Sequence, residues 1–202
     1  MPKVVIFSDL HNDVKSLERL MVIPADAYIC AGDLVTWARG FDKMGDALQR
    51  LAAGRADRVF VMPGNHESAS QIEDFCARYG FVNFHGKTAE LDGVRIAGLG
   101  YSAITPFQTP GEYTEDQFEA QLAAFTDYHP HILICHSPPL NTPLDRIKEG
   151  LHGGSRAVGD FIEAHQPGYF ACGHIHEAEG VVMQIGATQA RNVGKRGWVL
   201  EL

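Results

Sequence analysis

Five short apolar runs, each followed by a glycine or a polar residue, most constrain what this chain can fold into. The runs cover residues 4–8, 28–31, 59–63, 132–135 and 169–172. Short apolar runs bounded by turn residues are typical of buried β-strands. Ligands of open α/β sheets bind beyond the carboxyl ends of the strands. We therefore expect the polar residues that follow these runs to converge on one site, with Asp33 at its centre.

Helix signals alternate with the strand signals along the chain. The candidate N-caps are Asn12 or Asp13, the capping boxes Ser70 with Glu73 and Thr114 with Gln117, and Ser155. The expected helices end near residues 21, 53, 79, 127 and 166, and further strands are expected at 81–84, 94–98, 181–185 and 198–202. The alternation predicts an α/β fold. No strong helix signal follows residue 181, so the last part of the sheet is expected to be antiparallel.

The composition suits a single domain over residues 1–202. No run approaches the ~20 apolar residues of a membrane span. A strand that begins near Val4 leaves no room for a signal peptide, so we expect a cytoplasmic protein without membrane contact. The formal net charge of −8 argues against duplex nucleic acid as a partner, because contacts to phosphates dominate that affinity. The four cysteines lack metal-binding spacing and are expected to be buried hydrophobic residues.

Seven of the polar residues at the ends of the runs are potential metal ligands. They are Asp9, His11, Asp33, Asn65, His136, His174 and His176. A single catalytic metal with an open position takes about three protein ligands, so seven suit two metals, with Asp33 able to serve both. The mixture of imidazole, carboxylate and amide oxygen suits two divalent transition-metal ions, with Mn²⁺ favoured and Fe or Zn²⁺ as alternatives, better than it suits Ca²⁺.

Charge counting predicts that such a site attracts anions. Two divalent ions would be offset by two aspartates and by a bridging hydroxide, which leaves a charge of about +1 at a dinuclear centre. A small phosphate ester, such as a nucleotide, is therefore the expected partner. Two metals ~3.5–4 Å apart can clamp phosphoryl oxygens and lower the pKa of a bridging water.

His66 follows Asn65 directly, and we expect it to serve the reaction rather than to hold a metal, because neighbouring side chains tend to point apart. An imidazole at this place can protonate a leaving alkoxide or stabilise phosphoryl charge. Glu67 is expected to hold the His66 ring in one tautomer. The remaining histidines outside the loops are expected to be surface or structural residues, namely His85, His129, His131 and His165.

The five polar blocks resemble the signature of the calcineurin-like metallophosphoesterases. In chain order they are Asp9-Leu10-His11, Gly32-Asp33, Gly64-Asn65-His66-Glu67, His136 and Gly173-His174-Ile175-His176. The resemblance implies a four-layer α/β/β/α sandwich of the metallophosphoesterase type with a dinuclear metal site. By that likeness the ligands of one ion are Asp9, His11, Asp33 and His176, and those of the other are Asp33, Asn65, His136 and His174. The resemblance also implies that His66 assists the leaving group.

Further segments are similar to small Icc-related predicted phosphoesterases, which are related to cyclic nucleotide phosphodiesterases. These segments are 98–102, 105–107, 136–139, 151–155 and 173–177. The residues after Asp33 lack the acidic and arginine residues of Ser/Thr protein phosphatases. Trp37 stands near the position where purple acid phosphatases place a tyrosine ligand. Both of those subgroups are therefore disfavoured.

Two long loops, 99–113 and 137–154, follow strand ends on the predicted metal side and are expected to set substrate choice. In the first loop, Tyr101 and Phe107 either stack on a nucleobase or pack the loop itself. In the second, His152, Gly153 and Ser155 approach a helix N-terminus. This stretch either offers backbone N–H groups to an anion or forms an ordinary helix cap.

The leading hypothesis is a metal-dependent phosphoesterase that uses a hydroxide activated by two metals, with a phosphodiesterase acting on small nucleotide-like substrates favoured. The alternatives are a phosphomonoesterase and a non-catalytic metal-binding scaffold. The intact set of ligands together with His66 argues against the scaffold. The sequence leaves the substrate, the native metal and the oligomeric state open.

Overall fold

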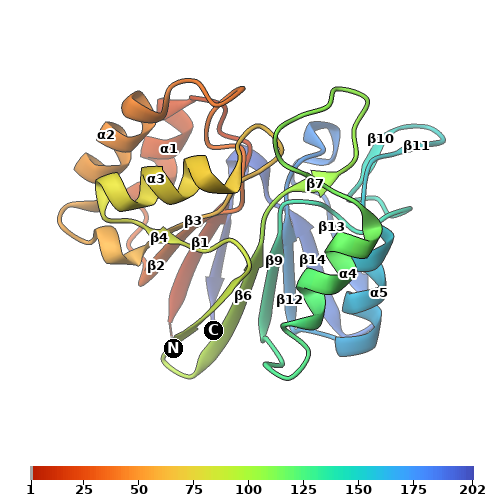
Figure 1. Cartoon of the computed structure of the whole chain (residues 1–202). Helices are drawn as coiled ribbons and strands as arrows, with labels where there is room; N and C mark the ends of the chain where they lie inside the picture. The colour runs from red at the N-terminus through yellow and green to blue at the C-terminus, as the bar shows by residue number, and fades with distance from the viewer. Residues whose placement is uncertain (1) are drawn as a thin grey trace.

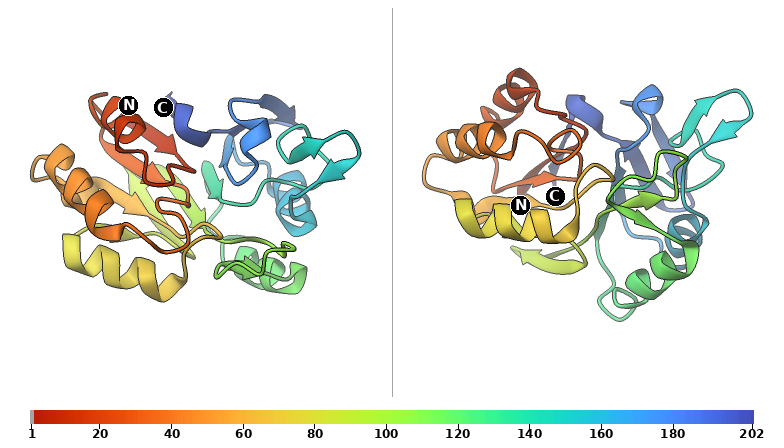
Figure 2. Two further views of the ribbon diagram at one scale, coloured as in Figure 1. Left: turned by 90° about the horizontal axis from the view of Figure 1, so that it is seen from above. Right: turned by 45° about the horizontal axis from the view of Figure 1, so that its top comes forward.

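The computed structural model describes residues 2–202 and contains two large β-sheets packed face to face (Figure 1). One sheet has five strands in the order β15-β1-β2-β3-β4, and the other has six in the order β13-β14-β12-β9-β6-β5. Helices α1, α2 and α3 cover the outer face of the first sheet, and α4 and α5 cover the second (Figures 1 and 2). The layers thus follow the order α/β/β/α, which confirms the predicted fold class.

The first half of the chain builds most of the five-stranded sheet. Its strands are β1 (Lys3–Phe7), β2 (Ala27–Cys30), β3 (Val59–Val61), β4 (Val82–Asn83) and β15 (Trp198–Glu201). Its helices are α1 (Val14–Met21), α2 (Phe41–Ala52) and α3 (Ala69–Tyr79), with the short helix η1 (Ala56–Arg58). Because β15 pairs with β1, the two ends of the chain lie close together (Figure 1).

The second half builds the six-stranded sheet. Its strands are β5 (Lys87–Leu91), β6 (Val94–Leu99), β9 (Ile132–Cys135), β12 (Tyr169–Cys172), β13 (Val182–Ile185) and β14 (Thr188–Asn192). Its helices are α4 (Glu115–Ala123) and α5 (Arg156–His165), with the short helices η2 (His176–Ala178) and η3 (Gly194–Arg196). The two long loops carry small strands of their own, which are β7 (Ser102–Ala103), β8 (Glu112–Tyr113), β10 (Arg146–Lys148) and β11 (Leu151–His152).

The core has three apolar layers, and strand β1 shows how the sequence fills two of them. Val5 and Phe7 pack with helices α1, α2 and α3, whereas Val4 and Ile6 pack between the two sheets. Both faces of the central parallel strands are buried, which explains why these strands are continuous apolar runs. The third layer lies between the six-stranded sheet and helices α4 and α5.

The parallel strands bring the predicted site residues to one edge. Strands β1, β2 and β3 are parallel, and so are β6, β9, β12 and β14. The antiparallel pairing expected after residue 181 is found between β13 and β14 and between β15 and β1. Strand β14, which runs parallel to β12, was missed because its alternating polar residues give no apolar run.

Helix caps agree with the sequence at three of four sites. Asp13 caps α1, Thr114 with Gln117 forms a capping box at α4, and Ser155 caps α5. The capping box of α3 is formed by Ser68 with Gln71, two residues before the predicted pair of Ser70 and Glu73. Both pairs have the required spacing, but Ser68 is the residue with extended backbone, and Ala69 is already helical.

Two further findings concern the helices and the cysteines. Among residues 2–202, no helix combines the length and the apolar character needed to cross a bilayer. All four cysteines are unbridged and buried, as their spacing predicted.

Candidate metal centre

The polar ends of five strands converge in the structure as the sequence predicted. Asp9 follows β1, Asp33 follows β2, Asn65 follows β3, His136 follows β9, and His174 and His176 follow β12. Three overlapping groups of side chains have potential ligand atoms within 4.8 Å of one another. The groups are Asp9–His11–His176, His11–Asp33–His66 and Asp9–Asp33–His136. Two neighbouring sheets therefore supply one continuous cluster.

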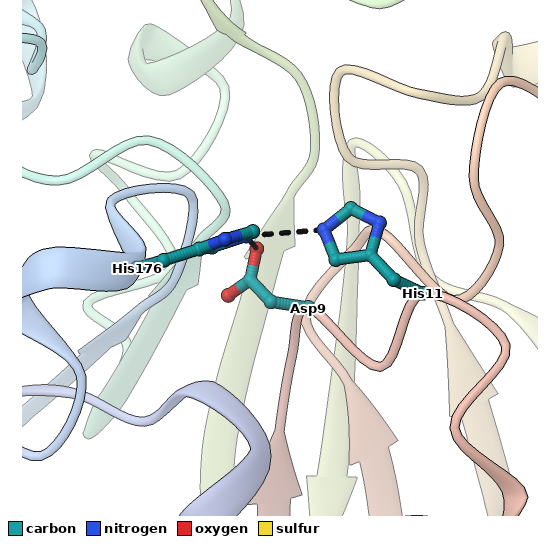
Figure 3. A group of neighbouring side chains, drawn as sticks. All are labelled: Asp9, His11 and His176. Atoms are coloured by element: carbon teal, nitrogen blue, oxygen red, sulfur yellow. Dashed lines mark hydrogen bonds and ion pairs between the residues drawn. The ribbon is translucent and has the colours of Figure 1, made fainter.

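The first group joins residues from opposite ends of the chain (Figure 3). The Nε2 atoms of His11 and His176 lie 3.1 Å apart, and His176 Nε2 lies 3.6 Å from Asp9 Oδ1. Burial raises the pKa of the Asp9 carboxyl, but the hydrogen bond with His176 and the charge of His136 outweigh burial and hold this pKa below its usual range. Two imidazole nitrogens and a carboxylate oxygen thus face the same small space.

The Asp33 carboxylate lies between His11 and His136. Its Oδ2 is 3.6 Å from His11 Nε2 and 3.5 Å from His136 Nε2, while its Oδ1 accepts the backbone N–H of His66 at 2.9 Å. Burial raises the pKa of Asp33, but His136 and then His11 lower it, so that the net pKa lies below the usual value. The carboxylate oxygen Oδ2 therefore faces ligands of both candidate ion sites.

His136 is completely buried and presents Nε2 to the cluster. Its Nδ1 lies 2.9 Å from the carbonyl oxygen of Ala31, to which it can donate a proton. Burial lowers the pKa of His136, but the Asp33 carboxylate more than offsets this and raises it to about 9. A histidine that donates one ring N–H to a backbone carbonyl has the orientation typical of a metal ligand.

Asn65 and His174 join the cluster next to His136. Asn65 Oδ1 lies 3.3 Å from His136 Nε2 and 3.0 Å from His174 Nδ1. The Asn65 amide nitrogen donates to Thr109 Oγ1, and Thr109 Oγ1 in turn donates to Glu112. Burial lowers the pKa of His174 to about 4, so its imidazole is neutral at physiological pH. The side-chain oxygen of Asn65 therefore faces a ring nitrogen of His136 and a ring nitrogen of His174.

The backbone at the strand ends is unusual, and its geometry explains the glycine before Asp33. Asp9, Asp33 and His174 have φ angles of 56°, 53° and 68°, in the left-handed region that non-glycine residues rarely adopt. Gly32 has φ 105°, and a Cβ there would lie 2.5 Å from His136 Nδ1. Such strain is concentrated at functional sites, where the surrounding fold holds it in place.

The residues present fit divalent cations. Asp9 and Asp33 are almost fully buried, and among residues 2–202 the ion-pair partners recorded for them are histidines, with neither Lys nor Arg. Burying two carboxylates beside each other is unfavourable unless positive charge compensates them. Carboxylate, amide and imidazole donors in one cluster suit first-row transition metals.

The structure gives Glu67 a different role from the predicted one. Its carboxylate is fully buried and accepts the backbone N–H groups of Gly64, Asp33 and Val35 at 2.8, 3.1 and 2.8 Å. Glu67 thus ties the loop after β2 to the loop after β3, and the expectation that it orients His66 is wrong. Burial, followed by the nearby Asp33 carboxylate, raises the pKa of Glu67 to about 8.

The His66 ring is oriented by the backbone instead. Its Nδ1 accepts the N–H of Trp37 at 3.1 Å, and its ring lies edge-on to the rings of Trp37 and His11. With Nδ1 occupied as an acceptor, the neutral imidazole carries its proton on Nε2. The tautomer predicted to need Glu67 is therefore set by Trp37.

A pocket of about 610 Å³ opens over the cluster and contains some of the predicted substrate-binding residues. Phe107, His152 and Gly153 line it, together with Trp37 and His66. Further apolar side chains from both long loops add to its walls, namely Ile104, Pro106, Ile147 and Leu151. The pocket is therefore mostly apolar above a polar floor.

Two predicted substrate-binding residues lie elsewhere. The Tyr101 hydroxyl accepts the backbone N–H of Ala69, and its ring packs against His85 and Tyr113, so Tyr101 takes the packing role. Ser155 is fully buried as the N-cap of α5.

The N-terminus of α5 is already bonded to a carboxylate of the protein, that of Glu115. Glu115 accepts the N–H groups of Arg156 and Ala157 and the hydroxyl of Ser155. The N–H groups of Gly153 and Gly154 are bonded to Asp145. These contacts support the helix-cap interpretation of this stretch rather than a backbone anion site.

Three polar residues near the site escaped prediction. Thr109 and Glu112 support Asn65, and the fully buried Asp145 lies 2.7 Å from the His152 ring through Oδ1. Their partners are distant in sequence or fall within irregular loops, so no helix or strand periodicity marked them. A Thr-x-x-Glu spacing in the first loop was the only available signal.

The fold and this cluster define the class of protein, which is an α/β/β/α sandwich with a cluster of Asp, Asn and His side chains at its strand ends. The family model described as calcineurin-like phosphoesterase matches residues 2–178. The chain therefore belongs to the calcineurin-like phosphoesterase family, as its motifs implied.

The chain is also similar to individual proteins. An uncharacterized protein of Methanocaldococcus jannaschii is 28% identical over 202 residues, which cover 97% of this chain and 89% of the relative. The solved structure of TT1561 from Thermus thermophilus has a TM-score of 0.71 at 19% identity and covers 96% of this chain and 89% of its own. A dimetal phosphatase from Danio rerio has a TM-score of 0.59 at 13% identity, with coverages of 95% and 87%. At these identities the two solved structures show the fold alone.

Proposed function

We propose that the chain is a metal-dependent hydrolase of phosphate esters, and more specifically a phosphodiesterase acting on small nucleotide-like substrates. The observation that carries this proposal is the cluster of potential ligands at the strand ends. Four of its members, Asp33, Asn65, His174 and His176, line a pocket with apolar walls. The likeness in fold to a dimetal phosphatase supports the same reaction class. The net reaction adds water across one P–O bond and yields a phosphomonoester and an alcohol.

In this proposal two divalent transition-metal ions, Mn²⁺ in the first place, bind side by side. The ligands of one are Asp9, His11, Asp33 and His176, and those of the other are Asp33, Asn65, His136 and His174. The position of Asp33 Oδ2 between His11 and His136 supports its role as the shared ligand. When bound, such a pair supplies Lewis acidity toward phosphoryl oxygens and toward water.

The proposed role of His66 is to donate a proton to the leaving oxygen. Its Nδ1 is occupied by the N–H of Trp37, so the proton of the neutral ring sits on Nε2. The ring lines the pocket and lies 5.0 Å from the His11 ring, which places it beside the candidate metal ligands. A positioned acid of this kind is typically worth ~10²–10⁴-fold in rate.

The pocket supports an ester of a single phosphate rather than a polyphosphate. Among the described residues that line it, none is Lys or Arg, so positive charge would come from the metals and from histidines. Trp37 and Phe107 are exposed aromatic side chains on its walls, which suit a planar or apolar substituent. A nucleoside monophosphate ester has this combination of one phosphate and one base.

The experiment is a comparison of two chromogenic substrates, bis(p-nitrophenyl) phosphate and p-nitrophenyl phosphate, with Mn²⁺ added. The expected result is a higher kcat/KM for the diester, with activity abolished by EDTA and restored by Mn²⁺. Preference for the monoester would favour the phosphomonoesterase. No activity on either substrate, at full metal occupancy, would favour the alternative that the protein is a non-catalytic metal-binding scaffold. Variant His129→Asn, which changes an exposed histidine away from the pocket, is the control for nonspecific effects.

A further inference from the structure

His152 and Asp145 form a pair on the pocket wall, outside the proposed metal ligands. His152 Nδ1 lies 2.7 Å from Asp145 Oδ1. Asp145 is completely buried, whereas the His152 side chain is 24% exposed and lines the pocket. Burying a carboxylate is unfavourable unless it is fully hydrogen-bonded. One of the hydrogen bonds of the Asp145 carboxylate is to His152, a side chain that lines the pocket.

Asp145 is held in a single orientation by the backbone. Its Oδ1 also accepts the N–H of Thr142 at 2.8 Å, and its Oδ2 accepts the N–H groups of Asn141 and Gly154 at 3.1 and 3.0 Å. With His152, four donors fill the acceptor positions of an ionised carboxylate. The His152 ring therefore carries a proton on Nδ1 and has a fixed orientation, which leaves Nε2 for a partner outside the protein.

The pocket places His152 and His66 on different halves of the molecule. His66 follows β3 of the five-stranded sheet. His152 ends β11, in the hairpin of β10 and β11, which in the sequence connects β9 to α5 and β12 of the second half (Figure 1). The metal cluster takes Asp33 from the first half and His136 from the second. A phosphate held at this seam would send the two ester arms of a diester in different directions, one toward each half.

We propose that His152, positioned by Asp145, binds the ester arm that stays on phosphorus when a diester is hydrolysed, through a hydrogen bond at Nε2. His66 then donates its proton to the oxygen of the other arm, which leaves. The inference rests on the proposed function, because it requires a phosphate ester at the metal cluster. It narrows the substrate class to diesters whose retained arm has a polar group close to the phosphate, as a nucleoside does. Ile147 and Leu151, from the same hairpin, offer apolar surface to the rest of that arm.

The experiment uses two substrates with the same leaving group, the p-nitrophenyl ester of thymidine 5′-monophosphate and p-nitrophenyl phosphate. Only the first has a retained arm, and p-nitrophenolate leaves both without needing a proton. For His152→Ala, the expected result is a loss of about tenfold in kcat/KM for the thymidine diester, mostly through KM, which corresponds to one hydrogen bond. The monoester should change by less than about twofold. His129→Asn should leave both substrates unchanged.

Asp145→Asn tests the positioning role. Its buried amide would face backbone N–H groups, so thermal melting must establish the folded fraction first. Among folded molecules the variant should repeat the loss for the diester and spare the monoester. A loss that is equal for both substrates would show that Asp145 acts only on the fold and would overturn its positioning role.

The outcomes separate the inference from the proposed function. If the wild-type protein hydrolyses neither substrate, the proposed function fails. If it hydrolyses the diester but His152→Ala changes both substrates equally, or neither, the inference is overturned and the proposed function stands. Wild-type activity on the monoester alone would overturn the inference as well, because no retained arm would then be bound.

Discussion

Asn65 donates its side-chain N–H to Thr109 Oγ1 across 3.3 Å, and this contact turns the Asn65 carbonyl oxygen toward His136 and His174. Thr109 is fixed in turn because its hydroxyl donates to Glu112, which also accepts the backbone N–H of Thr109. The amide of an asparagine has two nearly equivalent ends, so its neighbours decide which one faces a metal. Thr109, in the loop 99–113, thus sets the orientation of a proposed metal ligand.

Thr109→Val should weaken metal binding without replacing any proposed ligand. Valine keeps the shape of threonine but cannot accept the Asn65 N–H, so the amide loses the contact that orients it. Loss of such a supporting contact typically costs 10–100-fold in metal affinity. Mn²⁺ titration followed by calorimetry measures the change. Thr105→Val is the matched control, because Thr105 also donates to Glu112 but does not contact Asn65. Equal affinity losses in the two variants would assign the effect to the loop as a whole.

Asp33→Asn should weaken both ions together. Its Oδ2 lies within 3.6 Å of His11 Nε2 and His136 Nε2, which belong to the two proposed ion sites. Replacing the carboxylate by a neutral amide of the same size removes a charge that both ions would share. His176→Ala is the comparison, since it should lower occupancy at one site only. Elemental analysis at limiting and saturating Mn²⁺ gives the number of ions per chain. Unchanged double occupancy in Asp33→Asn would rule out the bridging role.

Much of the fold and of the candidate metal centre could be predicted because both depend on local sequence. A buried parallel strand is a short apolar run, and a glycine or polar residue where the run ends marks the strand end. Gly32 illustrates why, since a side chain there would collide with His136. Five such signals place their ligands on one edge without any knowledge of long-range contacts.

The contacts that support the site could not be predicted, because they join residues whose proximity depends on the complete fold. Glu67 stands beside His66 in the sequence, yet it bonds backbone groups of a loop more than thirty residues away. From the sequence, Tyr101 could either stack on a nucleobase or pack the loop. Its contacts with Ala69 and Tyr113, which the sequence does not reveal, support the packing role. The partner of His152, Asp145, lies in a loop without regular periodicity.

His85 should make the fold less stable as the pH falls from about 6.5 to about 4. Its Nδ1 accepts the N–H of Gly100, and burial, followed by the charge of Lys87, lowers its pKa to about 4. The unfolded chain has the ordinary histidine pKa of about 6.5, so in this window the unfolded state binds more protons and the free energy of unfolding decreases with falling pH. The contribution is fully present above about pH 6.5, with an upper limit of about 3 kcal/mol.

The measurement for His85 is urea unfolding at several pH values with EDTA present, so that metal release does not contribute. His85→Asn keeps an acceptor for the Gly100 N–H but does not titrate in this range. The slope of the unfolding free energy with pH should be smaller in this variant than in the wild type. Identical slopes would mean that His85 does not carry the predicted linkage.

The last prediction concerns His66, whose Nδ1 accepts the Trp37 N–H and whose Nε2 proton is proposed to reach the leaving oxygen. His66→Gln and His66→Ala should keep both ions, because neither removes a proposed ligand, although His66 lies close enough to His11 and Asp33 for its metal content to need checking. At full occupancy, turnover of a nucleotide diester with an alkoxide leaving group should fall by ~10²–10⁴-fold. Hydrolysis of a p-nitrophenyl ester should fall far less, because p-nitrophenolate leaves without a proton. A loss of the same size for both leaving groups would indicate that His66 stabilises phosphoryl charge instead. Loss of a metal ion would indicate that His66 is itself a ligand.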